Sequence, residues 1–112
     1  MALTADELRI TLLARMEFGP AARRPLDERL AERLTALTQS QRAAARSAAE
    51  DVVGAATRLV REFRAGKLPE DRIEPALLEL FPWLSAGATP HALPSKGLTA
   101  QVRSFAYYLV MK

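Results

Sequence analysis

The chain has 112 residues, of which 49% are hydrophobic and 26% are charged. This is the size and composition of one ordinary globular domain rather than of a disordered segment. The absence of cysteine excludes a disulfide framework, thiolate catalysis and a cysteine-based zinc site. No run of about 18 uncharged apolar residues occurs, so the sequence predicts no transmembrane helix.

The net charge of +3 is unevenly distributed along the chain. Residues 1–79 hold equal numbers of basic and acidic side chains, and Glu79 is the last acidic residue. Residues 80–112 therefore carry the whole excess, and they also hold most of the aromatic residues: Phe81, Trp83, Phe105, Tyr107 and Tyr108. An ordinary solvated surface could have this composition, but the asymmetry also makes the C-terminal third a candidate binding surface.

Two helices are predicted in the first third of the chain. Thr4 and Glu7 have the spacing of a capping box, and Gly19-Pro20 is a stop signal, so the first helix lies between them. Residues 19–25 are expected to form a linker. A second helix should run from Pro25 to about Leu37. Its leucines recur every three or four residues, which places the intervening Asp27, Glu28, Arg29, Glu32 and Arg33 on the outward face.

The longest predicted helix covers residues 39–65. Thr38 and Gln41 form a second capping-box pattern, and Gly66 is the expected residue after the helix end. Its apolar residues repeat about every 3.5 positions: Ala45, Ala49, Val52, Ala56, Leu59 and Phe63. This stripe favours a central helix against which the others pack, with a homodimer seam along its alanine-rich half as the alternative. The arginines at 58, 61 and 64 are expected on its solvated face, with Glu62 paired to Arg58.

Proline and glycine divide the rest of the chain. Pro75 predicts a turn over 69–73 and then a short helix from Pro75 to Leu80. Residues 82–97 have too many helix breakers for a regular element, and a last helix is expected from Leu98 to Val110. The sequence thus predicts an all-α, single-domain bundle of about five helices over residues 1–112, around the long helix at about 39–65. The predicted core comprises Leu8, Leu12, Leu30, Leu34, Val52, Ala56, Leu59, Phe63, Leu77, Phe105 and Leu109.

Nothing in the sequence favours an enzyme. Phosphate-binding glycine loops, nucleophile elbows and zinc-binding histidine motifs are missing. Neighbouring acids such as Glu50-Asp51 and Glu70-Asp71 diverge by about 100° on a helix and do not face each other. His91 is the single histidine. We therefore expect no catalytic residue, no cofactor and no metal site, and the acidic start of the chain predicts a cytoplasmic protein rather than an exported one.

The pattern that remains is typical of a protein-interaction module. Trp, Tyr and Arg are the residues that anchor interfaces. We predict that Trp83, Lys96, Arg103, Tyr107 and Tyr108 bind a protein partner, and the lack of carboxylates around them suits an acidic one. Tyr107 and Tyr108 cannot both face inward on a helix. A small bacterial regulator or adaptor, acting as a homo-oligomer, would fit this hypothesis.

Two alternatives stay open. The tyrosines could stack on nucleic-acid bases with Arg103 and Lys96 nearby, although no DNA- or RNA-binding motif is present. The second alternative is an inhibitor of the antitoxin or immunity type. Residues 63–67 (FRAGK), followed by a helix that ends in FPWL at 81–84, resemble small helical immunity proteins over about a fifth of the chain.

Overall fold

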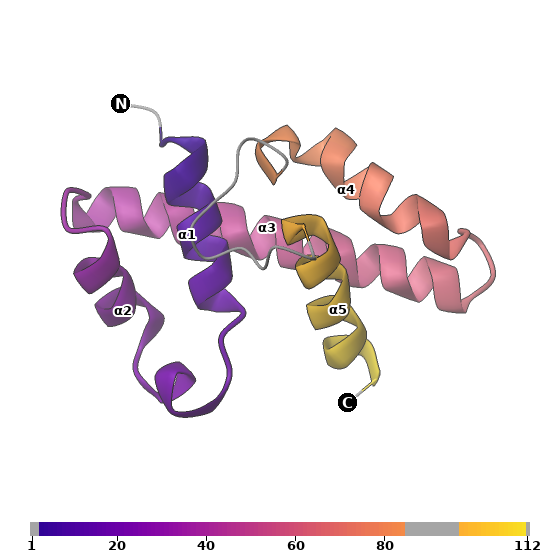
Figure 1. Ribbon diagram of the computed structural model, residues 1–112, viewed down its shortest axis with the longest axis horizontal. Helices are drawn as coiled ribbons and strands as arrows, with labels where there is room; N and C mark the ends of the chain where they lie inside the picture. The colour runs from indigo at the N-terminus through magenta and orange to yellow at the C-terminus, as the bar shows by residue number, and fades with distance from the viewer. Residues whose placement is uncertain (1–2, 85–96, 112) are drawn as a thin grey trace. The chain divides into compact units, whose positions relative to one another are not determined.

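The computed structural model describes residues 3–84 and 97–111 (Figure 1). These residues form five α-helices and no strand, which confirms the predicted all-α class and the long middle helix. The helices are α1 (Ala5–Arg15), α2 (Leu26–Arg33), α3 (Gln39–Arg64), α4 (Ile73–Leu80) and α5 (Leu98–Met111). Short 3₁₀ turns lie at Gly19–Arg23, Glu70–Arg72 and Pro82–Leu84. None of the described helices is both long and apolar enough to cross a membrane.

The chain divides into two compact units, Met1–Glu50 and Asp51–Lys112. We call them the N-terminal and C-terminal units. Helix α3 contributes its first half to one and its second half to the other. The organisation of the chain as one domain stays a prediction, so each unit is described by itself.

The capping box at the start of α1 forms as the sequence predicts. The Thr4 hydroxyl accepts a hydrogen bond from the Glu7 amide at 3.1 Å, and the Thr4 amide donates to the Glu7 carboxylate at 2.8 Å. The helix ends at Arg15, before the predicted Gly19-Pro20 stop. Gly19 instead opens a 3₁₀ turn with a φ of 75°, a value that favours glycine, so part of the expected linker is helical.

Helix α2 is shorter than the leucine spacing predicts. It ends at Arg33, and Leu34 leaves the helical conformation at φ −122° and ψ 61°. A turn follows in which the Leu37 amide donates to the Leu34 carbonyl at 3.1 Å. The turn keeps both leucines in one buried cluster with Ala14 and Leu30, so the apolar spacing reflects a shared core rather than a continuous helix.

Both ends of α3 are built as expected. Thr38 and Gln41 exchange the two capping-box hydrogen bonds, at 2.8 and 3.1 Å. At the other end Gly66 has a φ of 77°, its amide donates to the Phe63 carbonyl, and the Lys67 amide donates to the Glu62 carbonyl. This pair of bonds is a Schellman motif, which closes the helix because glycine adopts the left-handed conformation without a Cβ penalty.

The predicted core is largely buried. Leu8, Phe63 and Leu109 are the exceptions, since each is only partly buried. Several buried positions were absent from the prediction, among them Thr11, Ala14, Val53, Val60 and Ile73. Helices bury a stripe wider than one residue per turn, and Val53 and Val60 lie beside the predicted stripe of α3.

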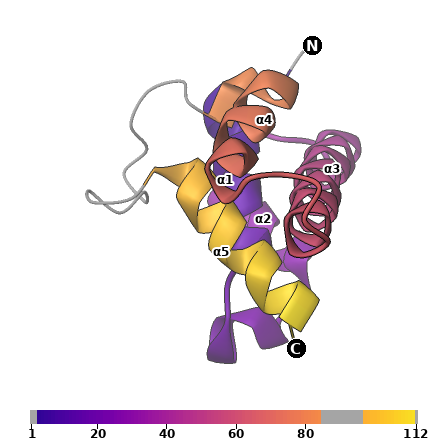
Figure 2. The same cartoon turned by 90° about the vertical axis from the view of Figure 1, so that its right-hand side faces the viewer.

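In the C-terminal unit, α4 begins at Ile73, two residues before the predicted start at Pro75. Proline is tolerated there because the first turn of a helix has no intrahelical partner for its N–H groups. Figure 2 shows α5 beside α4, and polar contacts join the two helices. Glu74 accepts a hydrogen bond from the Thr99 hydroxyl at 3.2 Å and forms an ion pair with Arg103 at 3.0 Å.

Candidate functional site

The predicted partner-binding residues differ in how much of each side chain reaches solvent. Tyr108 is 50% exposed on α5, and its ring lies against that of Phe105 with centroids 6.4 Å apart. Met111, one turn further along the same helix, is 58% exposed. Residues three apart share a helix face, so these two side chains present adjacent apolar surface to solvent.

Tyr107 faces a different direction. Its ring packs edge-on against Phe63 of α3, with centroids 6.1 Å apart and planes at 86°. Burial raises the pKa of the Tyr107 hydroxyl, and the nearby negative charge of Glu70 adds to that increase. Tyr107 is therefore a packing residue that joins α5 to the end of α3. Of the two tyrosines, Tyr108 is the more exposed, which agrees with the expectation that both cannot face inward.

Trp83 lies in the 3₁₀ turn after α4 and is partly buried. Its ring meets Phe81 edge to face, with centroids 6.3 Å apart. The next residue, Leu84, is fully packed and is 3% exposed. Trp83 is thus partly exposed and packed against its neighbour, and its predicted role in partner binding stays a prediction.

The positive charge predicted for the C-terminal third is compensated at Arg103, which lies within the described residues. Arg103 pairs with Glu74 of α4, so its cation is balanced within the unit. Lys96 lies outside the described residues, as does most of the predicted loop at 82–97. Counting the charges of residues 80–112 could not reveal this ion pair, because Glu74 lies before that segment.

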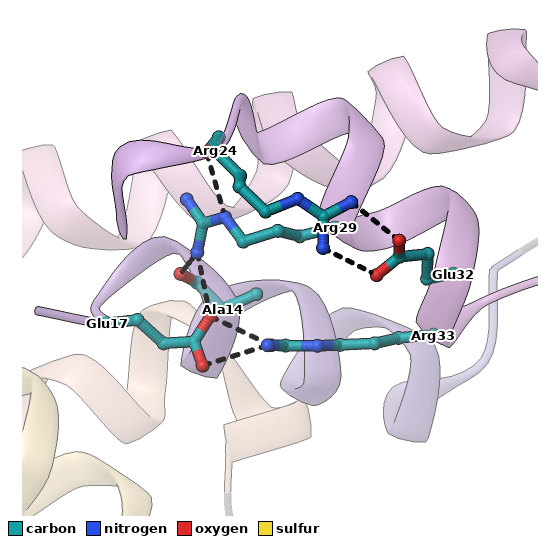
Figure 3. A network of polar contacts seen from close by, with 6 residues as sticks. All are labelled: Ala14, Glu17, Arg24, Arg29, Glu32 and Arg33. Atoms are coloured by element: carbon teal, nitrogen blue, oxygen red, sulfur yellow. Dashed lines mark hydrogen bonds and ion pairs between the residues drawn. The ribbon is translucent and has the colours of Figure 1, made fainter. Parts of the chain in front are cut away.

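Sequence reasoning also misplaced Arg29, which was expected on the outward face of α2. Its side chain is buried, with 7% of the residue exposed. Figure 3 shows Arg29 reaching the C-terminal end of α1, where it donates to the Ala14 carbonyl at 2.8 Å and to the Glu17 carboxylate at 2.7 Å. The last carbonyls of a helix have no intrahelical donor and carry partial negative charge, so a cation there stabilises the helix end.

Two further ion pairs surround this contact. Arg33 donates to the other Glu17 oxygen at 3.0 Å, and Arg24 holds Glu32 with two hydrogen bonds of 3.0 and 2.5 Å (Figure 3). The hydrogen bond from Arg33, reinforced by Arg29, lowers the pKa of the Glu17 carboxyl. The network ties the end of α1 to α2, which is a structural role.

The described arginines fall into two groups. One group pairs with carboxylates: Arg9, Arg15, Arg24, Arg29, Arg33, Arg42, Arg46 and Arg103. The other group is exposed and forms no ion pair within the described ranges: Arg23, Arg58, Arg61, Arg64 and Arg72. The expected pairing of Glu62 with Arg58 is therefore wrong. Apart from Arg23, the unpaired arginines lie in the second half of α3 and just after it.

In comparisons with known proteins, no protein-family model, curated protein or solved structure matches the chain.

Proposed function

We propose that this protein is a small non-catalytic binding module that engages a protein partner through the outer face of α5. The observation that carries the proposal is the pair Tyr108 and Met111, which are adjacent on that face and at least half exposed. Tyrosine is enriched among residues that dominate binding energy, and methionine adapts its shape to a partner surface.

The surroundings of this pair are consistent with an interface. The Tyr108 ring lies beside the ring of Phe105, which is itself buried, so the exposed ring has a packed neighbour. Preorganised aromatic side chains lose little conformational entropy on binding. A regulator, an adaptor and an immunity-type inhibitor would all use such a surface.

Nucleic-acid binding by the same region is the less favoured function. It requires positive charge beside the tyrosines, and the described cation there, Arg103, is balanced by Glu74. Within the described residues of α5, a stacking platform whose cation is already paired is a weak nucleic-acid site.

The test is affinity capture with the tagged chain, with and without nuclease, using the wild type and Tyr108→Ala/Met111→Ala. Leu80→Ala is the control for loss of exposed apolar surface, since Leu80 on α4 is 51% exposed; it removes one such side chain where the α5 variant removes two. The proposal expects one stoichiometric protein partner that survives nuclease, is lost with the α5 variant and is retained by the control. Partners that disappear with nuclease would favour the nucleic-acid alternative, and equal recovery with all three proteins would overturn the assignment of the face.

A further inference from the structure

We propose that Arg58, Arg61, Arg64 and Lys67 bind carboxylates of an acidic segment in the protein partner. We call these four residues the basic ridge. The inference rests on the proposed function, and it adds the chemistry of the partner and a second contact region outside α5.

The four cations of the basic ridge are exposed and, like Arg23 and Arg72, uncompensated within the described residues. Their side chains form no ion pair with any carboxylate in that part of the chain. In the N-terminal unit, arginines find carboxylates even when exposed, as Arg24, which lies just before α2, does with Glu32. Free guanidinium groups keep all their donors available for a partner's carboxylates, to which they can bind in a planar, two-bond geometry.

The ridge has a defined geometry. Its three arginines follow one another at three-residue spacing, so their Cα atoms advance about 4.5 Å per step along a band that winds about 120° around the helix. The Schellman turn at Gly66 fixes the backbone from which Lys67 follows. The ridge therefore extends along the final turns of α3 and into the hydrogen-bonded turn that closes it, where Lys67 lies.

An acidic protein segment fits the ridge better than a nucleic acid does. Glu62 lies within the ridge sequence, and the exposed Glu70 and Asp71 follow it closely. A phosphate backbone carries negative charge at every nucleotide and would be repelled by these carboxylates. A protein can instead place its own acids opposite the cations alone, so a mixed pattern of charge favours a protein partner.

The ridge and the exposed face of α5 belong to the same unit. Phe63, which lies between Arg61 and Arg64 in sequence, packs against Tyr107, the residue before Tyr108. The contact joins the end of α3 to the last turns of α5. A single partner with apolar residues for α5 and acidic residues for the ridge would engage both, with charge accelerating association and the apolar contacts slowing release.

The experiment selects peptides from a displayed random 16-residue library on the intact chain and titrates the most enriched one, as a synthetic peptide, by fluorescence anisotropy. Arg61→Glu is compared with Arg23→Glu, a charge reversal at an exposed, unpaired arginine of the N-terminal unit. The two variants have the same net charge, so a difference between them reports position rather than overall charge. The same peptide is titrated with the Tyr108→Ala/Met111→Ala variant, and a 20-base-pair DNA duplex is titrated with the wild type and with Arg61→Glu.

The inference expects enriched peptides rich in Asp and Glu, about three- to tenfold weaker binding to Arg61→Glu, and little change for Arg23→Glu. Equal losses for the two reversals, peptides without excess acid, or no enriched peptide would each overturn it. Loss of binding in the α5 variant with full binding by Arg61→Glu would leave the proposed function standing and remove the ridge. Tighter binding of the duplex than of the peptide, lost in Arg61→Glu, would assign the ridge to nucleic acid instead.

Discussion

Most arginines of the N-terminal unit pair with carboxylates, whereas most described arginines of the C-terminal unit do not; Arg23 and Arg103 are the exceptions. In the N-terminal unit Arg29 is buried and donates to the end of α1, while Arg24 and Arg33 hold carboxylates beside it. In the C-terminal unit the basic ridge on α3 stays exposed and unpaired within the described residues. The arginine-rich composition therefore does not indicate one role for all arginines. Paired arginines fasten the fold, and we propose that the unpaired ones of the basic ridge bind a partner.

The largest expected effect on the free energy of unfolding comes from the apolar core rather than from the arginines. Leu77 is fully buried in the C-terminal unit, and Leu77→Ala should lower the free energy of unfolding by about 2–5 kcal/mol, because it removes packed methyl groups and leaves a cavity. Leu80→Ala on the exposed side of α4 should change it by less than about 0.5 kcal/mol. Urea unfolding measures both, and similar losses would contradict the burial of Leu77.

A smaller effect is expected for the buried arginine. Arg29→Ala should cost about 1–3 kcal/mol, because it removes the buried side-chain donor to the Ala14 carbonyl, which keeps only the longer bond from the Glu17 amide at 3.3 Å, and removes one cation from Glu17. Arg33→Ala is the control, since Arg33 is more exposed and Glu17 keeps Arg29; we expect a loss below about 1 kcal/mol. Urea unfolding of the two variants should rank them in this order, and the reverse order would show that Arg29 is not the main link.

The Glu17 network should also make stability depend on pH. The pKa of Glu17 is lower in the folded chain than its ordinary value of 4.5, so its contribution is present above about pH 4.5 and is lost as pH falls through the lowered folded-state pKa. Glu17→Gln should therefore be about 0.5–1 kcal/mol less stable than the wild type at pH 7. The gap should close below pH 4.5 in urea titrations at several pH values; a gap that widens on acidification would refute the assignment.

The smallest effect belongs to the basic ridge. Arg61→Ala should change the free energy of unfolding by less than about 0.5 kcal/mol, because the side chain is exposed and forms no ion pair within the described part of the chain. A loss as large as that of Arg29→Ala in the same urea experiment would mean that the ridge is structural.

Local rules predicted much of the fold. The Thr4 and Thr38 capping boxes and the Gly66 helix end depend on residues within one turn, and all three form as expected. Pro75 was placed correctly near a helix start, although the helix begins two residues earlier. Such features follow from backbone chemistry at one place in the chain.

The misses came from contacts between distant residues. Arg29 was assigned to solvent because its neighbours on α2 are polar, and its carbonyl partner lies fifteen residues away on α1. Arg103 was counted as free charge, but the fold brings Glu74 beside it. The partner-binding roles of Trp83, Lys96, Arg103, Tyr107 and Tyr108 stay predictions, and Met111 joins the candidate site because a helix places it one turn from Tyr108.

The most direct measurement is the reaction rate of each arginine with phenylglyoxal in the native chain, followed by peptide mass spectrometry. The reagent reports access to the guanidinium group itself, so it compares both units in one sample. We predict fast modification of Arg58, Arg61 and Arg64 and slow modification of Arg29. Modification of Arg29 as rapid as that of Arg61 would contradict the division into paired and free arginines.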